Sequence, residues 1–356
     1  MKKFDEKFVT DFIAIAKQRE PDFNNLLKVL AKKAPDRHTL FEFFMNDEIY
    51  MKFAELTEPP KTTLDYYKMR IQAYKTGGYD YCTLPCSGFY FASNANQHNK
   101  SSRSMNDCSV ICDRESYAAY KWLDPKDFSA DMLKASEEFL PEGMKIIVHG
   151  PCGVLENALL IVGYENLGYM LADDPGLARE IFDHVGGALV TYYESVSGMD
   201  IVGGYISNDD WGFNTQTMLS VEDMRKYVFP WHKKIAETAH RNSKPVILHS
   251  CGQAREIYDD IIDDMKFDGK HSYEDKIQPV EEAYEMLNPR IAVLGGIDID
   301  FLCRRTPEEI YNRSCAMLER AEKRGGYALG TGNSVPHFVP YENYVAMIAA
   351  AVVNSL

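Results

Sequence analysis

Several features are missing from this sequence, and each absence removes a class of protein. No basic run stands out and the formal net charge is −14, which argues against nucleic acid or an anionic membrane as a partner. No apolar run has the length of a membrane span, and the initial residues MKKFD do not resemble a signal peptide. The eight cysteines are scattered without a dense disulfide framework, so we expect a cytoplasmic protein with free or metal-bound thiols.

The sequence also lacks a G-x-G-x-x-G turn and a Walker motif, which removes the common nucleotide-binding folds. It has instead a series of short, continuous apolar runs separated by helical patterns. Such runs are typical of parallel strands that are buried on both faces. We expect eight strands, at 39–44, 79–84, 145–149, 201–207, 246–249, 267–271, 291–294 and 326–329.

Eight strands that alternate with helices predict an α/β protein with the (β/α)8 TIM-barrel fold, and a doubly wound open sheet is the rival architecture. The length of 356 residues fits one such domain. We expect a single domain over 1–356, with a helical extension at 1–34. The polar, irregular stretch 86–127 is expected to be a long loop insertion that shapes a pocket.

The run KPVILHSCG at 244–252 carries the strongest chemical signal. Side chains alternate along a strand, so His249 and Cys251 point the same way and make half of a zinc site. Glu156, soon after the third strand, is the expected third metal ligand. His149 and Cys152 are rivals for that position, and a buried core His beside a buried Cys is the alternative interpretation.

Other polar residues also follow the predicted strands, where a barrel places its chemistry. Adjacent acids repel, so Asp209 or Asp210 is a candidate proton donor, and a helix N-cap or a solvated turn is the alternative. His271 is a candidate general acid or base, or a residue that supports a metal ligand. Asp298 and Asn333 are expected to face a cofactor. The complete set of strand-end residues is Glu42, Cys86, His149, Asp209, Asp210, His249, Cys251, His271, Asp298, Thr331 and Asn333.

The order of several motifs resembles the uroporphyrinogen decarboxylase superfamily, over most of the chain. The motifs are PDRHTLFEFF (35–44), VLENALLIVGYENL (154–167), NDDWG (208–212), HSCG (249–252), KHSYED (270–275), GGIDIDFL (295–302) and GTGNSVPHFVPYENY (330–344). The resemblance implies a (β/α)8 barrel. It also implies one of two activities, because the family has a metal-free decarboxylase branch and a branch of zinc methyltransferases that exchange methyl groups with a corrinoid protein.

The decarboxylase branch carries an Arg-rich N-terminal signature, which is not found here: Arg70 is the only arginine between Glu42 and Tyr79. The methyltransferase branch uses His-x-Cys and a later Cys, so the resemblance implies that His249 and Cys251 bind zinc. Thr331 stands where those enzymes place the later Cys. The site therefore needs Glu156 or another strand-end group as a ligand.

These observations predict a zinc-dependent methyltransferase that moves a methyl group between a small O-, N- or S-methylated substrate and a corrinoid (cobalamin) carried by a partner protein. A metal-free decarboxylase that acts on a tetrapyrrole or another carboxylic acid is the first alternative. A non-catalytic protein that binds corrinoid or a small ligand is the second. A homodimer is left open.

Overall fold

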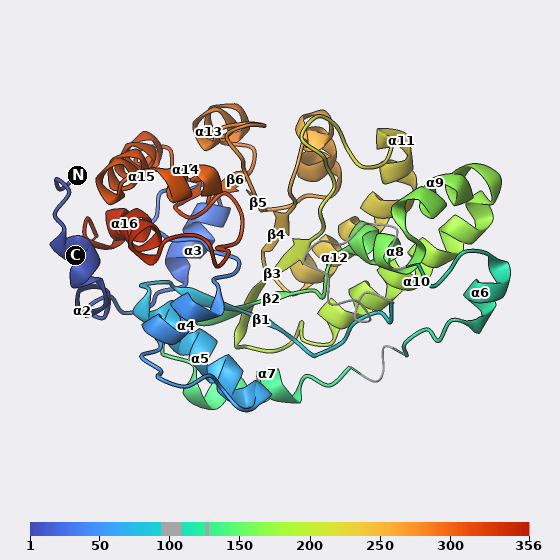
Figure 1. Cartoon of the computed structure of the whole chain (residues 1–356), viewed down its shortest axis with the longest axis horizontal. Coiled ribbons are helices and arrows are strands. Elements are labelled where there is room, and N and C mark those ends of the chain that lie inside the picture. The colour runs from blue at the N-terminus through green and yellow to red at the C-terminus, as the bar shows by residue number, and fades with distance from the viewer. Residues whose placement is uncertain (94–108, 125–127, 356) are drawn as a thin grey trace.

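A seven-stranded parallel sheet forms the centre of the molecule in the computed structural model, which describes residues 1–93, 109–124 and 128–355 (Figure 1). The strands follow one another across the sheet in chain order, so each is joined to the next by a crossover that carries helices. Within the described residues they are β1 (Tyr81–Pro85), β2 (Lys145–His149), β3 (Val202–Asn208), β4 (Val246–His249), β5 (Gly269–His271), β6 (Ala292–Leu294) and β7 (Tyr327–Ala328). The α/β class predicted from the apolar runs is confirmed.

The prediction of a strand at 39–44 is wrong, and so is the prediction of a fully closed barrel. Leu40 forms only an isolated parallel bridge with Leu329, beside β7. On the other side, hydroxyl groups take the place of a backbone ladder: Tyr81 donates to the Glu42 carbonyl at 2.8 Å, and Thr83 donates to the Phe43 carbonyl at 2.7 Å. The described strands therefore form a half-barrel with a seam between residues 40–44 and β1.

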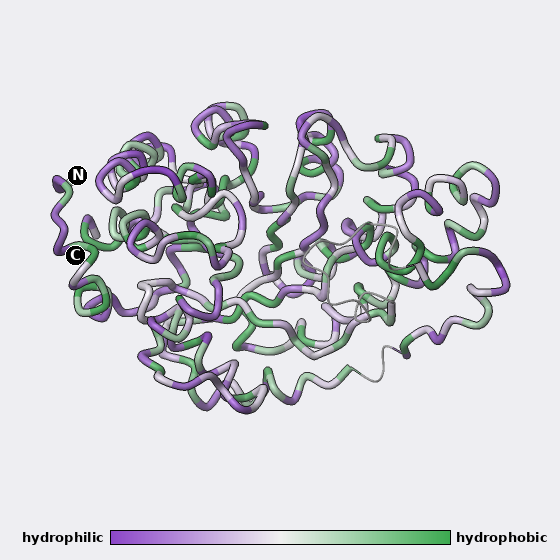
Figure 2. Tube along the Cα trace, viewed as in Figure 1, coloured by the Kyte–Doolittle hydropathy of each residue, from purple (hydrophilic) through white to green (hydrophobic). Residues whose placement is uncertain are grey.

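Helices surround the sheet, with the most apolar segments at the centre and hydrophilic segments outside (Figures 1 and 2). Side-chain caps fix several helix starts, for example Asn46 on α4 and Thr62 on α5. The helices of the first half are α1 (Lys7–Thr10), α2 (Phe12–Ala16), α3 (Asn24–Leu30), α4 (Asp47–Phe53), α5 (Thr63–Thr76), α6 (Arg114–Ala119), α7 (Asp131–Ala135), α8 (Val154–Val162), α9 (Tyr164–Asp173) and α10 (Pro175–Glu194). Those of the second half are α11 (Val221–Asp223), α12 (Phe229–Arg241), α13 (Val280–Leu287), α14 (Ile299–Arg304), α15 (Pro307–Ala321) and α16 (Tyr341–Val352).

The predicted helices at 1–34 are observed as α1 to α3. Of these, α1 and α2 pack against α16 near the end of the chain, where the Lys2 amide donates to the Asn354 side chain at 2.7 Å, whereas α3 packs against β7 (Figure 1). The predicted insertion at 86–127 contains α6, but its parts at 94–108 and 125–127 lie outside the described residues. None of the helices in the described residues is long and apolar enough to cross a membrane.

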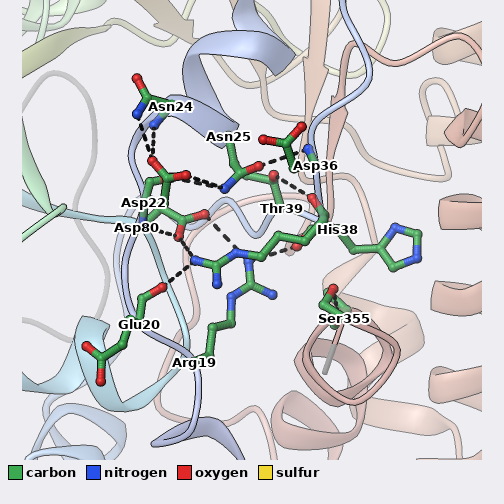
Figure 3. A network of polar contacts seen from close by, with 12 residues as sticks. Arg19, Glu20, Asp22, Asn24, Asn25, Asp36, His38, Thr39, Asp80 and Ser355 are labelled. Carbon is green, nitrogen blue, oxygen red and sulfur yellow. Dashed lines mark hydrogen bonds and ion pairs between the residues drawn. The ribbon is translucent and has the colours of Figure 1, made fainter.

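Buried charges join these first helices to the amino-terminal end of the sheet (Figure 3). Asp80, directly before β1, is ion-paired with Arg37 and, at 3.5 Å, with Arg19. Its carboxylate also accepts a hydrogen bond from the Asp22 amide at 2.9 Å. Three segments that are distant in the sequence are thus held by one carboxylate, at the end of the sheet away from the polar strand ends.

Candidate metal centre

Three side chains with metal-binding atoms meet at the carboxyl ends of β3 and β4. In the described part of the chain, Asp210, His249 and Cys251 are the one group of at least three such residues, and their ligand atoms all lie within 4.8 Å of one another. The strand register explains the meeting, because Asn208 of β3 pairs with His249 of β4. The Cys251 amide then donates to Asp210 Oδ1 at 2.9 Å, which fixes the carboxylate beside the thiol.

The two histidines of β4 and β5 determine which nitrogen of His249 is free. His271 Nε2 lies 3.0 Å from the Thr331 carbonyl, which can only accept, so this nitrogen carries a proton. Burial lowers the pKa of His271 to about 3 and that of His249 well below its usual value, so both rings are neutral. His271 Nδ1 therefore accepts from His249 Nδ1, at 2.8 Å. His249 Nε2 is left with an unprotonated lone pair, which is the form that binds a metal ion.

The donor set and its spacing fit zinc. His249 Nε2 lies 3.8 Å from Cys251 Sγ, close to the roughly 3.6 Å expected for a nitrogen and a sulfur on one tetrahedral zinc ion. Burial raises the pKa of the Cys251 thiol, so a cation would have to displace its proton on binding. The Asn333 amide donates to Cys251 Sγ at 3.1 Å and the Ser272 hydroxyl at 3.6 Å, which are contacts that favour a thiolate.

Asp209, predicted as a candidate proton donor, is fully buried, and both its oxygens have hydrogen-bond donors. The amides of Leu155 and Glu156 donate to it at 2.9 Å each, so it holds the start of α8. Trp211 Nε1 and His232 Nε2 also lie within 2.8 Å of Asp209 Oδ2. Asp209 is thus not the N-cap residue of α8, which is Gly153, but its carboxylate accepts from the first turn of that helix.

Glu156, predicted as the third metal ligand, lies outside the group formed by Asp210, His249 and Cys251. Its carboxylate caps the first turn of α8 by accepting from the Gly153 amide at 3.2 Å. Burial, and then the charges of Asp209 and Asp210, raise its pKa to about 8. Asp210, and not Glu156, therefore lies beside His249 and Cys251.

The rival ligands His149 and Cys152 are also outside the group. His149 Nδ1 lies 3.0 Å from the Gly150 carbonyl and donates to it, whereas Nε2 is buried without a partner. Cys152 has a left-handed backbone, with φ of 73°. Burial raises the pKa of its thiol to about 12.

Thr331, which stands where the later Cys was expected, contacts Glu42 and the carbonyl of Asn333. Its hydroxyl donates to Glu42 Oε1 at 2.8 Å and its amide to Glu42 Oε2 at 3.3 Å. Burial raises the pKa of Glu42 to about 8, so this carboxyl group is protonated at neutral pH.

Asp298 and Asn333, the residues predicted to face a cofactor, line one cavity of about 420 Å³ next to the metal group. Asn333 connects the two, because its amide contacts Cys251 Sγ. Asp298 caps α14 by accepting from the Phe301 amide at 3.1 Å. Ser272, which contacts Cys251, was missed, and only its position directly after His271 could have indicated it.

Comparison with known proteins agrees with this architecture. The structure of a methyltransferase from Methanosarcina mazei superposes with a TM-score of 0.65 at 17% identity, over 92% of this chain and 97% of that one. Among curated proteins, a methylated-thiol–coenzyme M methyltransferase of Methanosarcina mazei is 27% identical over 193 residues, which are 53% of this chain and 48% of that protein. A uroporphyrinogen decarboxylase of Anaeromyxobacter dehalogenans is 25% identical over 196 residues, 53% of this chain and 51% of that protein.

The chain thus spans about half the length of the curated relatives it matches. The family model described as uroporphyrinogen decarboxylase (URO-D) matches residues 123–352, from before β2 to the end of α16. This region contains all three residues of the metal group. The chain belongs to the uroporphyrinogen decarboxylase family.

Proposed function

We propose that this protein is a zinc-dependent methyltransferase that exchanges a methyl group between a small methylated substrate and a corrinoid protein. The observation that carries the proposal is the group of Asp210, His249 and Cys251, with an unprotonated nitrogen of His249 aimed at the thiol. The similarity to a methylated-thiol–coenzyme M methyltransferase supports the same activity.

Asp210, His249 and Cys251 would hold the zinc ion. When bound, zinc supplies a Lewis acid that polarises the heteroatom of a methylated substrate or activates a thiol. His271 keeps His249 in the tautomer whose Nε2 is free, and Asn333 and Ser272 donate to the sulfur. We therefore propose positioning roles for His271 and Asp209 and a ligand role for Asp210.

The methyl carrier would meet the substrate at the carboxyl ends of the strands. The cavity lined by Asp298 and Asn333 opens beside the metal group there. We propose that the corrinoid partner docks over this end. Its corrinoid would then enter the cavity and approach the zinc ligands from the side of Asn333.

Metal analysis of protein purified without added zinc tests the proposal. We expect about one zinc per chain, lost in Cys251→Ser and in Asp210→Asn, and retained in the control Cys315→Ser. Cys315 suits this purpose because its thiol lies on α15, away from the metal group. Zinc-loaded protein should then demethylate a methyl donor in the presence of a corrinoid protein, and the Cys251→Ser variant should not. A fully active Cys251→Ser protein would contradict the zinc role.

A metal-free decarboxylase is the second candidate, because a uroporphyrinogen decarboxylase is also among the relatives. It predicts decarboxylation of a carboxylic acid substrate that survives treatment with a chelator. Turnover measured before and after removal of metal therefore distinguishes the two candidates: the methyltransferase should lose activity and the decarboxylase should keep it.

A further inference from the structure

Arg70 is a buried cation without a carboxylate partner among the described residues. It lies on α5, which packs against β1, and is 4% exposed. Its guanidinium carbon lies over the rings of Phe44 at 5.4 Å and Tyr50 at 5.2 Å. Nη2 donates to the neutral Thr83 hydroxyl at 2.8 Å, and Nε has no acceptor. An arginine keeps its charge at any ordinary pH, so this arrangement leaves a positive charge unbalanced in the interior.

Another substantially buried arginine of the described chain shows what a balanced arrangement looks like. Arg313 makes paired contacts with Asp275, at 2.7 and 2.8 Å, and with Glu281, at 2.9 and 3.0 Å. No carboxylate of the described residues makes such contacts with Arg70, although its environment is drier. The missing partner of Arg70 is therefore an anion that the described chain does not supply.

An unpartnered acceptor lies next to this cation. His149 is 8% exposed, and its Nδ1 donates to the Gly150 carbonyl, which leaves Nε2 as a buried lone pair without a donor. Its ring meets Phe44 edge-on at 4.9 Å, and Arg70 lies over the same ring. The charge of Arg70 contributes to lowering the pKa of His149, after the larger effect of burial.

Aromatic rings connect this pair with the candidate metal centre. Phe44 stacks on Phe43 at 3.9 Å, and Phe43 lies 4.7 Å from the ring of His249. The path from Arg70 to His249 therefore runs along the rings of Phe44 and Phe43. The rings between them favour a ligand with a flat, apolar body.

We propose that Arg70 and His149 form a carboxylate-binding subsite for the substrate of this protein, so that the substrate is a small methylated carboxylic acid. The carboxylate accepts from Arg70, and a hydroxyl group of the ligand or a water molecule held beside the carboxylate donates to His149 Nε2. Phe44 is partly exposed and contacts both residues, so rotation of this ring admits the ligand. The subsite itself rests on the unpaired groups, and only the methylated character of its ligand rests on the proposed function.

Calorimetric titration of the full chain, with and without zinc, tests the subsite. The probes are 4-methoxybenzoate and methoxybenzene, which differ by one carboxylate. We expect the acid to bind at least about tenfold more tightly than the neutral compound, equivalent to about 1.4 kcal/mol. Arg70→Met should remove this preference, and His149→Phe should weaken it with Arg70 in place. Arg255→Met, at an exposed arginine, should retain it.

Equal affinity for the two probes, or an unchanged preference in a folded Arg70→Met protein, would overturn the subsite. Circular dichroism of each variant establishes folding, and Arg70→Lys, which keeps the charge without the planar fork, provides a second variant. Zinc content is measured on the same samples. Protein without zinc that still prefers the acid would contradict the proposed function but support the subsite. Protein with zinc that shows no preference for the acid would contradict the subsite alone.

Discussion

The two ends of the sheet treat arginines in opposite ways. At the amino-terminal end, Arg19 and Arg37 share Asp80, which also binds the Asp22 amide (Figure 3). At the seam near the carboxyl end, Arg70 has aromatic rings and a hydroxyl group around it and no carboxylate among the described residues. The first arrangement balances charge within the chain, although Arg19 Nε and Nη1 and Arg37 Nε also have no acceptor among the described residues. The second leaves a charge for something else to balance.

This difference follows the division of labour in barrel-like folds, where one end provides stability and the other provides chemistry. The paired cluster is still costly to bury: desolvation lowers the pKa of Arg19 to about 10 even with Asp80 beside it. Arg70 has no such carboxylate among the described residues, so its burial near the candidate metal centre favours a functional reason. Four substitutions test this comparison. Two change the arginine clusters and two change residues near the metal group, and each measures whether the residue stabilises the fold or serves binding.

The largest effect is expected for Asp80→Asn. This change leaves Arg19 and Arg37 without a counter-charge, and breaking a buried ion pair from one side costs about 3–5 kcal/mol. Urea unfolding followed by circular dichroism measures the loss. Asp36→Asn is the control, because the Lys28–Asp36 pair is exposed and should contribute less than about 1 kcal/mol. Equal losses in the two variants would show that the buried network has no special role.

The second effect is expected for His271→Phe, which removes the acceptor for the His249 Nδ1 proton. His249 can then place its proton on Nε2, which blocks the metal-binding lone pair. Loss of such a supporting group typically lowers metal affinity by about 10- to 100-fold. Competition with a chromophoric chelator measures zinc affinity, and His240→Phe, at a histidine paired with Asp268 on the surface, is the control. His271→Gln should recover part of the affinity, since the amide oxygen of glutamine can accept a hydrogen bond from His249 Nδ1.

Much of this arrangement could be predicted from the sequence, because strand alternation places His249 and Cys251 on one face. The apolar runs predicted all seven observed strands. The run at 39–44 was misleading, since the Glu42 and Phe43 carbonyls bind hydroxyl groups of β1 and not a neighbouring backbone. Asp210 was predicted as an acid and not as a neighbour of His249 and Cys251, because its orientation depends on the Cys251 amide across the strand end. Such contacts between elements leave no local signal.

A pH-dependent effect is expected at Glu42, whose folded pKa of about 8 lies above its ordinary value of 4.5. Between these pH values the folded protein keeps a proton that the unfolded chain releases. Stability should therefore fall as pH rises from about 5 to 8, by up to about 1.4 kcal/mol per pH unit from this group. Glu42→Gln should remove this pH dependence. The free energy of unfolding of the variant, measured in urea, should therefore rise relative to that of the natural protein as pH increases. A constant difference between pH 5 and 8 would mean that Glu42 is ionised in the fold.

The smallest effect on folding is expected for Arg70→Met, although Arg70 is as buried as Asp80. Methionine fills similar space among Phe44, Tyr50 and Tyr66, and the substitution removes an unbalanced charge. We expect the free energy of unfolding to change by less than about 1 kcal/mol, or to rise, against a loss of several for Asp80→Asn. Urea unfolding is then repeated with saturating 4-methoxybenzoate. The acid should stabilise the natural protein and leave Arg70→Met unchanged, because only Arg70 gains a counter-charge from it. A large loss of stability in Arg70→Met without ligand would instead place Arg70 with Arg19, as a residue that the fold itself requires.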